Sequence, residues 1–241
     1  MPERPNPYPG QRFPADVIAH AVRLYLRFAL SFRDVEELLA ERGVAVSYET
    51  VRRWVAKFGA PYAEELRRRR PHTSRIWHLD EMAVRVGGRL HWLWRAVDEH
   101  GEPLDVFLQA QRDTAAAARF FRRLLDATGG TPPARITTDK LGSYAAALRE
   151  VPELAGIEHQ QVRSAQRCNN RVEQAHQSTR VRERVMRRFK SAVSAQQFLD
   201  AFSRVGNLFR PGRHRMTAPA YRTTMRERVA LWREVAGLQA A

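Results

Sequence analysis

Residues 76–86 read IWHLDEMAVRV, and this stretch decides the fold. It is rich in apolar and aromatic residues, as strands are, and the Gly87-Gly88 pair that follows is typical of a hairpin turn. Residues 90–97, LHWLWRAV, predict a second strand, and residues 104–108 predict a third after another turn. The sequence therefore predicts three antiparallel strands that follow one another along the chain.

Downstream of these strands, helical and strand patterns alternate. They are a helix capped by Asp113 and ending near Ala127, a strand at 134–138, a helix at 144–149, a strand at 157–162 and a helix from Asn169 to about Lys190. Strands that alternate with helices indicate a sheet with helices packed on it. Together with the first three strands, this order predicts a mixed α/β sheet with flanking helices.

The first sixty residues predict three helices. Apolar residues recur at the helical period over residues 13–28, and Ser31 with Asp34 forms a capping box for a second helix. The third helix begins near Ser47 and is expected to end at Gly59-Ala60-Pro61. Three short helices around a tight turn have the proportions of a helix-turn-helix domain.

The outward face of the third helix carries Arg52, Arg53 and Lys57. If this helix lies in a major groove, these cations can reach base edges or phosphates. The alternative is an ordinary three-helix domain whose charged face is only solvated. The pattern alone leaves both interpretations open.

The overall charge favours nucleic acid as the partner. Lys and Arg number 41 against 26 Asp and Glu, a formal net charge of +15, and only three of the cations are lysines. Arginine binds phosphate through two parallel hydrogen bonds, so this composition suits a polyanion. The chain has no apolar run long enough for a membrane span and no secretory leader, and its single cysteine excludes an internal disulfide. We expect a soluble cytoplasmic protein without a membrane partner.

Three acids fall at informative places. Asp80 lies within the first strand, Asp139 directly follows the fourth, and Glu173 lies in the first turns of the long helix. Burying an unpaired carboxylate is costly, and a cation that draws the three together removes that cost. Hard oxygen ligands of this kind suit Mg²⁺ or Mn²⁺. The alternative is that each acid pairs with one of the many arginines.

Three other acids are expected to lie outside this group. Glu81 adjoins Asp80 on a strand, so strand alternation turns its side chain to the opposite face and excludes it from the site. Asp98 and Asp105 stand at the edges of turns, where solvated aspartates are common.

An ordered set of motifs resembles the DDE transposases of bacterial insertion sequences, most closely the IS-six family. The motifs are Trp77-His78-Leu79-Asp80-Glu81, Arg95-Ala96-Val97-Asp98, Thr138-Asp139-Lys140 with Tyr144, and Asn169-Asn170-Arg171-Val172-Glu173 with His176. The resemblance spans nearly the whole chain, including the helical region before residue 58. It implies a ribonuclease-H-like mixed sheet with flanking helices, preceded by a small all-helical helix-turn-helix domain.

The resemblance also implies the chemistry. Asp80, Asp139 and Glu173 are the expected catalytic residues and metal ligands, with Asp80 shared between two Mg²⁺ or Mn²⁺ ions. Two such ions about 3.5–4 Å apart clamp a phosphodiester. Water first frees a 3′-hydroxyl at the end of the element, and that hydroxyl then attacks the target DNA.

Further residues are predicted to surround this site. The family commonly places a cation seven residues after the glutamate, which is Arg180 here. On a helix, His176, Arg180, Arg184 and Arg187 share the face of the glutamate, so the arginines are expected to contact DNA phosphates; a solvated helix face is the alternative. His78, Lys140 and His176 are expected to lie around the metal ligands without binding the ions directly.

The predicted organisation has four parts. Residues 1–58 form an arm and a helix-turn-helix DNA-binding domain, residues 59–75 a basic linker, residues 76–195 the catalytic domain and residues 196–241 a helical extension.

The predicted function is that of a transposase that binds terminal inverted repeats and carries out metal-dependent cleavage and strand transfer. Its partners are double-stranded DNA, both element ends and target, and further copies of the chain in a homodimer or larger assembly. The expected location is the bacterial cytoplasm, on the nucleoid when DNA is bound. Two alternatives are an inactive helix-turn-helix protein and a ribonuclease-H-like nuclease without strand transfer.

Overall fold

A computed structural model describes residues 8–69, 75–162, 170–211 and 216–238, with the side chains of residues 170–175 not described. The chain forms two compact units. One unit takes its residues from both ends of the sequence, 1–70 and 201–241, and the other comprises residues 71–200. The sequence predicts residues 196–241 as a helical part that follows the catalytic domain.

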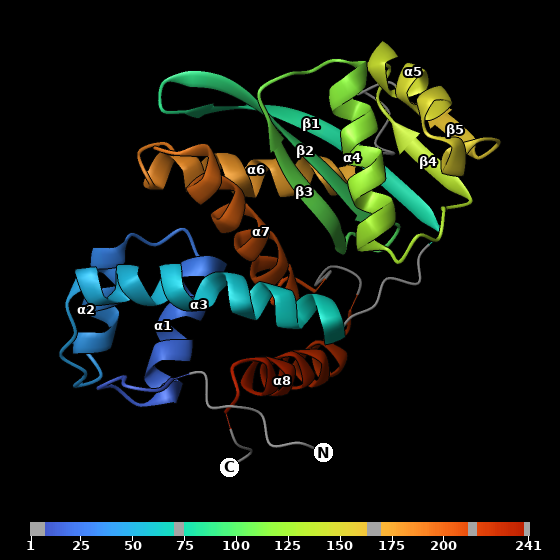
Figure 1. The fold of residues 1–241 in the computed structure, drawn as a ribbon. Helices are drawn as coiled ribbons and strands as arrows, with labels where there is room; N and C mark the ends of the chain where they lie inside the picture. Colours follow the sequence, from blue (N-terminus) through green and yellow to red (C-terminus); the bar gives the residue numbers. More distant parts are fainter. Residues whose placement is uncertain (1–7, 70–74, 163–169, 212–215, 239–241) are drawn as a thin grey trace. The chain divides into compact units, whose positions relative to one another are not determined.

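The unit of residues 71–200 is built on a five-stranded sheet (Figure 1). Its strands are β1 (Ile76–Val86), β2 (Arg89–Asp98), β3 (Pro103–Gln109), β4 (Arg135–Thr138) and β5 (Glu158–Gln161). The order across the sheet is β3-β2-β1-β4-β5, with β1, β2 and β3 antiparallel and β4 and β5 parallel to β1. The mixed sheet predicted from the sequence is confirmed, and its order is ribonuclease-H-like.

The hairpin between β1 and β2 turns on Gly87 and Gly88, both of which have positive φ angles, +56° and +80°. Two-residue hairpin turns need this left-handed backbone, which glycine adopts without a steric penalty. A side chain at Gly87 would also approach the backbone oxygen of Lys190 to 3.2 Å. The pair therefore fixes the register that places Asp80 opposite Arg95.

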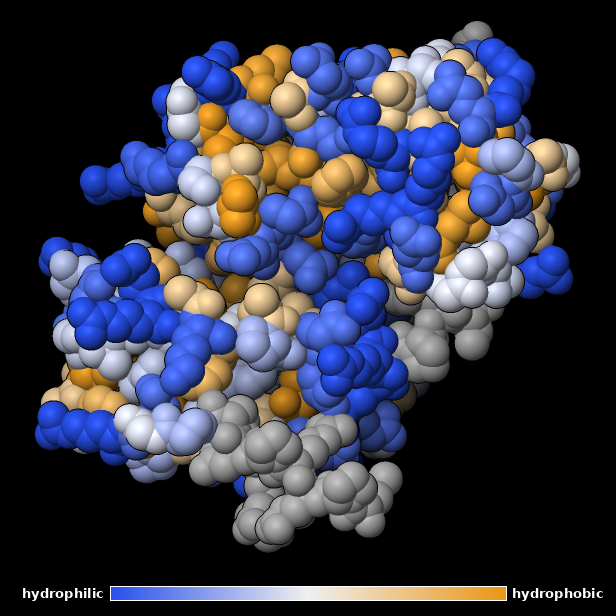
Figure 2. All heavy atoms as spheres, viewed as in Figure 1, coloured by the Kyte–Doolittle hydropathy of each residue, from blue (hydrophilic) through white to orange (hydrophobic). Residues whose placement is uncertain are grey.

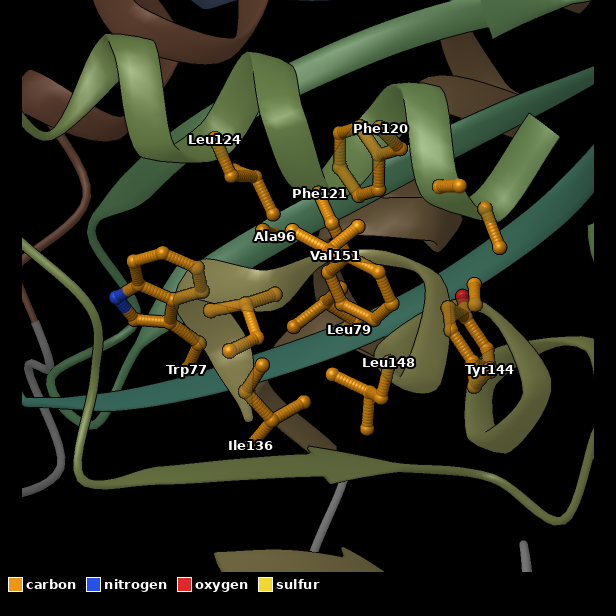
Figure 3. Packing of buried hydrophobic residues seen from close by; sticks show 14 of the residues in the cluster. Trp77, Leu79, Ala96, Phe120, Phe121, Leu124, Ile136, Tyr144, Leu148 and Val151 are labelled. Atoms are coloured by element: carbon orange, nitrogen blue, oxygen red, sulfur yellow. The ribbon is translucent and has the colours of Figure 1, made fainter. Parts of the chain in front are cut away.

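One face of this sheet packs against α4 (Thr114–Ala127) and α5 (Gly142–Glu150). Odd-numbered residues of β1 point to this face, and Figure 3 shows Trp77 and Leu79 packed in one cluster with Phe120, Phe121 and Leu124 of α4. Asp113 caps α4 by accepting the N–H of Ala116 at 2.7 Å, as the sequence predicts. This core holds β1 and β4 together at the place where the candidate site forms.

Even-numbered residues of β1 face α6 (Asn170–Val185) and the start of α7 (Ala192–Leu208). Met82 and Val84 pack there with Phe189 and Leu199 in a second, smaller core. The predicted helix from Asn169 to Lys190 is wrong at its C-terminal end, because α6 stops at Val185. Phe189 is 5% exposed and pairs with Val86 as an isolated parallel bridge, which a continued helix would prevent.

The other unit contains α1 (Ala15–Arg27), α2 (Phe32–Ala40), α3 (Tyr48–Arg69) and, from the C-terminal part, α8 (Ala218–Val235). The capping box predicted at the start of α2 is present: Ser31 Oγ accepts the N–H of Asp34, and the Asp34 carboxylate accepts the N–H of Ser31. The three N-terminal helices expected from the sequence are confirmed.

The predicted end of the third helix at residues 59–61 is wrong, because α3 continues through Pro61 to Arg69. Proline removes one helical hydrogen bond and disfavours a helix interior. Phe58, Tyr62 and Leu66 nevertheless continue the buried stripe of α3, so burial outweighs the proline. Residues 59–69 are accordingly helical and do not form the expected linker.

Hydrophilic side chains are spread over the visible face of both units, with hydrophobic ones between them (Figure 2). Within the described residues, no helix is long and apolar enough to cross a membrane.

Candidate active site

The parallel pairing of β1 with β4 brings Asp80 and Asp139 together. His78 lies opposite Thr137 in this register, so Asp80 and Asp139 are level with one another two residues further on. One carboxylate oxygen from each lies within 4.8 Å of the other. The carboxyl end of β4 stops at Thr138, and Asp139 follows it directly. The structure thus joins two of the three predicted acids.

Asp80 is partly exposed, with 24% of its side chain accessible, and it faces α6. His176 Nδ1 lies 3.5 Å from Asp80 Oδ2, and Asp80 Oδ1 accepts the N–H of Glu81 at 3.0 Å. Across the sheet, the buried Arg95 is its partner in the β1–β2 register and donates to Thr179 Oγ1 at 2.9 Å. The Asp80 carboxylate is therefore held between Arg95 of β2 and His176 of α6, and it remains partly accessible.

Burial lowers the pKa of His176 to about 3, with smaller contributions from the positive charges of Arg95 and Arg180. The imidazole is therefore neutral at neutral pH, and its contact with Asp80 is one between a neutral ring and a carboxylate. His176 thus lies beside Asp80, one of the predicted metal ligands. It is 3% exposed, so it does not share the exposed side of α6 that carries Arg180 and Arg184.

Glu81 corrects a prediction. Its side chain does turn to the α4–α5 face, but one carboxylate oxygen lies within 4.8 Å of oxygens of both Asp80 and Asp139. The expected exclusion from the site is wrong because Asp139 lies beyond the end of β4, where side chains from both faces of β1 approach it.

The carboxylate of Glu81 is fully buried and held at both oxygens. Arg112 Nε donates to Oε1 at 2.7 Å, and the hydroxyl of Tyr144 donates to Oε2 at 2.6 Å. Burial raises the pKa of Glu81, while these two hydrogen bonds oppose that rise. Arg112 also lies over the Trp92 ring, 4.7 Å from its centroid. No sequence pattern predicted this network, although Tyr144 accompanies the Thr138-Asp139-Lys140 motif.

The remaining predicted residues around the site are placed as follows. His78 is buried on β1, Lys140 is exposed, and Asp139 Oδ1 accepts the N–H of Leu141 at 2.9 Å. Glu173 lies on α6, but its side chain falls outside the part of the chain that the structure describes.

Asp98 and Asp105 were expected to be solvated, and that prediction is wrong. They are 6% and 3% exposed. Asp98 Oδ1 accepts the N–H groups of His100 and Glu102, both at 2.8 Å, and the Asp105 carboxylate pairs with Arg123 at 2.5 Å. Backbone N–H groups of the turn thus compensate the burial of Asp98, and Arg123 compensates that of Asp105. Neither belongs to the acidic cluster.

The predicted DNA-contacting arginines of α6 are exposed. Arg180 and Arg184 lie one turn apart on the open side of the helix. Arg187 was expected on the same helical face and does not lie there, because α6 has already ended and its φ angle is +55°.

In the N-terminal unit, Arg52, Arg53 and Lys57 are all exposed on α3. Glu49 accepts two hydrogen bonds from Arg52, at 2.6 and 2.9 Å, and lies 3.7 Å from Arg53. These cations are available to a ligand, with Glu49 as the only acid that pairs with Arg52 and Arg53 among the described residues.

The donor set of the acidic cluster fits a divalent cation of the Mg²⁺ class. Asp80, Glu81 and Asp139 offer only carboxylate oxygens, the hard ligands that Mg²⁺ and Mn²⁺ prefer. Arg112 neutralises one of the three negative charges, so an added dication meets an excess of negative charge. An acidic cluster on a ribonuclease-H-like sheet defines a class of metal-dependent phosphoryl-transfer enzymes.

The family described as the DDE domain matches residues 74–212. The transposase of the insertion sequence-like element IS431mec from Staphylococcus aureus is 31% identical over 208 residues, covering 86% of this chain and 91% of its own length. The transposase of insertion sequence element IS257 in transposon Tn4003, also from Staphylococcus aureus, matches with the same identity and coverage. The chain therefore belongs to the IS-six family of DDE transposases, enzymes that cleave DNA and transfer strands.

Among solved structures, the catalytic domain of the Mos1 mariner transposase is similar with a TM-score of 0.42 and 16% identity. That similarity covers 74% of this chain and 90% of the Mos1 chain.

Proposed function

We propose that this protein binds the terminal inverted repeats of its insertion sequence and uses two Mg²⁺ or Mn²⁺ ions to cleave the ends and join them to target DNA. The observation that carries the proposal is that carboxylate oxygens of Asp80, within β1, and of Asp139, directly after β4, lie within 4.8 Å of one another although the residues are far apart in the sequence. We also propose that it acts on the nucleoid in the bacterial cytoplasm.

Asp80, Asp139 and Glu173 are the proposed metal ligands, with Asp80 shared. When bound, the ions lower the pKa of an attacking oxygen and stabilise the charge on a leaving oxygen. His176 holds Asp80 from the α6 side, and Glu81, fixed by Arg112 and Tyr144, lies against both aspartates from the other side. Asp80 and Glu81 are thus held in place by their neighbours beside Asp139, which favours binding of a cation at these carboxylates.

The reaction has two steps of the same kind. In the first, water attacks the phosphodiester at the element end, the bond to the 3′-oxygen breaks, and a 3′-hydroxyl and a 5′-phosphate result. In the second, that 3′-hydroxyl attacks a target phosphodiester and releases a new 3′-hydroxyl from the target. Arg180 and Arg184 lie on the exposed side of α6, where they suit contacts with the DNA backbone.

Recognition of the element ends is assigned to residues 1–58. The exposed Arg52, Arg53 and Lys57 of α3 are the proposed contacts to DNA, and the capped α2 precedes them as in a helix-turn-helix domain. Replacing Arg52 and Arg53 together by alanine is expected to abolish the preference for a duplex that carries the repeat. A preference that survives this change would exclude α3 as the recognition helix.

The metal site is tested by cleavage of a labelled duplex that carries an element end. Asp80→Asn, Asp139→Asn and Glu173→Gln are each expected to slow Mg²⁺-dependent cleavage about a thousandfold, and EDTA is expected to abolish cleavage by the unaltered protein. Asp126→Asn is the matched control, because Asp126 is an exposed acid on α4 away from the cluster. Cleavage retained by any of the three variants would remove that residue from the site.

Strand transfer separates the transposase from a nuclease of the same fold. A pre-cleaved end with a free 3′-hydroxyl is incubated with a supercoiled plasmid and Mg²⁺. We expect covalent joined products, and hydrolysis without joining would favour a nuclease.

Two ends must be joined in one event, so we propose a homodimer or larger assembly. Sedimentation of the full chain with and without an end duplex tests this. A complex that contains one copy of the chain and two ends would contradict it.

A further inference from the structure

A pocket of about 410 Å³ lies at the tip of the β1–β2 hairpin, away from the acidic cluster. We call it the hairpin pocket, and its lining consists of Gly87, Gly88, Arg187, Arg188, Phe189 and Lys190. Phe189 is the buried member of this lining, at 5% exposure, and its carbonyl oxygen accepts the N–H of Gly87 at 2.9 Å. The three cations of the lining are exposed.

The backbone of the hairpin pocket is unusual. α6 ends in a Schellman pattern, in which the N–H of Arg187 bonds to the carbonyl of Arg184 and the N–H of Arg188 to that of Glu183. Glycine commonly occupies the left-handed position of this motif, but here Arg187 and Arg188 have φ angles of +55° and +73°. Two consecutive side chains held in a disfavoured conformation point to a functional use.

None of these three cations has an acidic partner among the residues that the structure describes. Elsewhere in the same unit, Arg112 pairs with Glu81 and Arg123 with Asp105. Arg187, Arg188 and Lys190 therefore concentrate uncompensated positive charge around one concave site, which is the electrostatic signature of an anion site.

The hairpin pocket is connected to the acidic cluster by two rigid elements. β1 extends from Asp80 to Val86, and α6 follows it, since His176 contacts Asp80 and Glu183 accepts the N–H of Arg85 at 3.3 Å. Gly87 follows Asp80 by seven residues, which is about 23 Å at about 3.3 Å per strand residue. That distance corresponds to about seven base pairs of duplex at about 3.4 Å each.

We propose that the hairpin pocket binds one backbone phosphate of DNA, about seven base pairs from the phosphate that reacts at the acidic cluster. The inference rests on the proposed function, because it takes DNA as the substrate. Arg180 and Arg184 are exposed on α6, which extends from the contact with Asp80 to the hairpin pocket, and they add positive charge to this part of the surface. Such contacts fix the position of the duplex and carry no sequence information.

The test compares two charge-matched double variants of the full chain. Arg187→Gly with Arg188→Gly removes the two cations and supplies the residue that the left-handed backbone prefers. Arg122→Gln with Arg149→Gln removes two exposed cations from α4 and α5, on the other side of the sheet. The probe is a fluorescent duplex of 50 base pairs that carries an element end.

We expect the glycine pair to weaken binding about tenfold, the size of one charge-assisted hydrogen bond. The slope of log affinity against log salt is expected to fall by about one, as for the loss of one phosphate contact. The melting temperature of the glycine pair is expected not to decrease, so that unfolding is excluded as the cause of the weaker binding. If the glycine pair binds DNA with the same affinity and the same salt dependence as the variant with Arg122→Gln and Arg149→Gln, the proposal is wrong.

A second experiment tests where the bound phosphate lies on the duplex and whether it belongs to DNA at all. Single phosphates of the duplex are replaced by uncharged methylphosphonates. For the unaltered protein, we expect a loss of affinity at one position five to nine base pairs from the cleavage point, and no loss at that position for the glycine pair. If inorganic phosphate at millimolar concentration stabilises the unaltered protein but not the glycine pair, while the methylphosphonate scan shows no such position, the pocket is a free-phosphate site and the proposal fails. Cleavage retained by Asp80→Asn would refute the proposed function without changing these binding results.

Discussion

The middle of β1 and its end at the hairpin tip carry opposite charges. At Asp80 and Glu81, acidic groups gather and the most buried one is compensated by Arg112 and Tyr144. At the hairpin tip, cations gather in the hairpin pocket without acidic partners among the described residues. A buried charge must be paired to be tolerated, whereas an exposed one remains free for a ligand. The same strand thus carries a site for cations and, seven residues away, a proposed site for anions.

The largest expected effect is at the acidic cluster. Asp80→Asn removes a shared metal ligand, which should cost about 4 kcal/mol of transition-state stabilisation, or about a thousandfold in cleavage rate. Binding of the end duplex in the absence of metal should change less than about threefold, because phosphate contacts carry the affinity. Rates from single-turnover cleavage and affinities from fluorescence anisotropy check both statements. A parallel loss of cleavage rate and DNA affinity would mean that the acidic cluster also holds the DNA.

The second prediction concerns the compensation of Glu81. Glu81→Ala leaves Arg112 and Tyr144 without their shared acceptor, and we expect a loss of about 2 kcal/mol in the free energy of unfolding, less than for a fully buried pair because Arg112 is partly exposed. Tyr144→Phe, which removes one hydrogen bond, should cost about 1 kcal/mol. Urea unfolding followed by tryptophan fluorescence measures both, and equal stability of Glu81→Ala and the unaltered protein would contradict the role of this network.

The third prediction concerns strain at the cationic end. Arg187→Gly replaces a side chain at a φ angle of +55° by the residue that tolerates it, and this should stabilise the protein by about 1 kcal/mol. Arg180→Gly is the control: it lies within α6, where glycine should destabilise by about 1 kcal/mol. The melting temperature should therefore rise for Arg187→Gly and fall for Arg180→Gly. A change of the same sign in both variants would show that the backbone at Arg187 is not strained.

The smallest expected effect extends the comparison to α3, where Arg52 is paired with Glu49 on an exposed surface. Glu49→Gln removes a negative charge and releases Arg52, so DNA affinity should rise about twofold, in keeping with the small energies of exposed ion pairs. The gain should diminish at high salt. A fall in affinity would indicate that Glu49 orients Arg52 for binding.

Much of the fold follows from local patterns in the sequence. The strands at 76–86 and 90–97, the capping box at Ser31 and the strand before Asp139 are all confirmed. These features depend on residue alternation, turn glycines and capping side chains, which act over a few neighbouring residues. Helix ends were less predictable, since α3 passes through Pro61 and α6 stops at Val185 without a glycine or proline nearby. Burial of Phe58, Tyr62 and Phe189 decides both ends, and burial depends on residues distant in the chain.

The sequence by itself determined the residue types at the candidate site, the order of strands and helices, and the excess of arginine that suits a polyanion. Only the tertiary structure decided that Glu81 joins the two aspartates and that Arg187 leaves the helical face to line the hairpin pocket. The physical reason is that a side chain's direction follows from local backbone geometry, whereas its neighbours are set by packing between segments far apart in the chain.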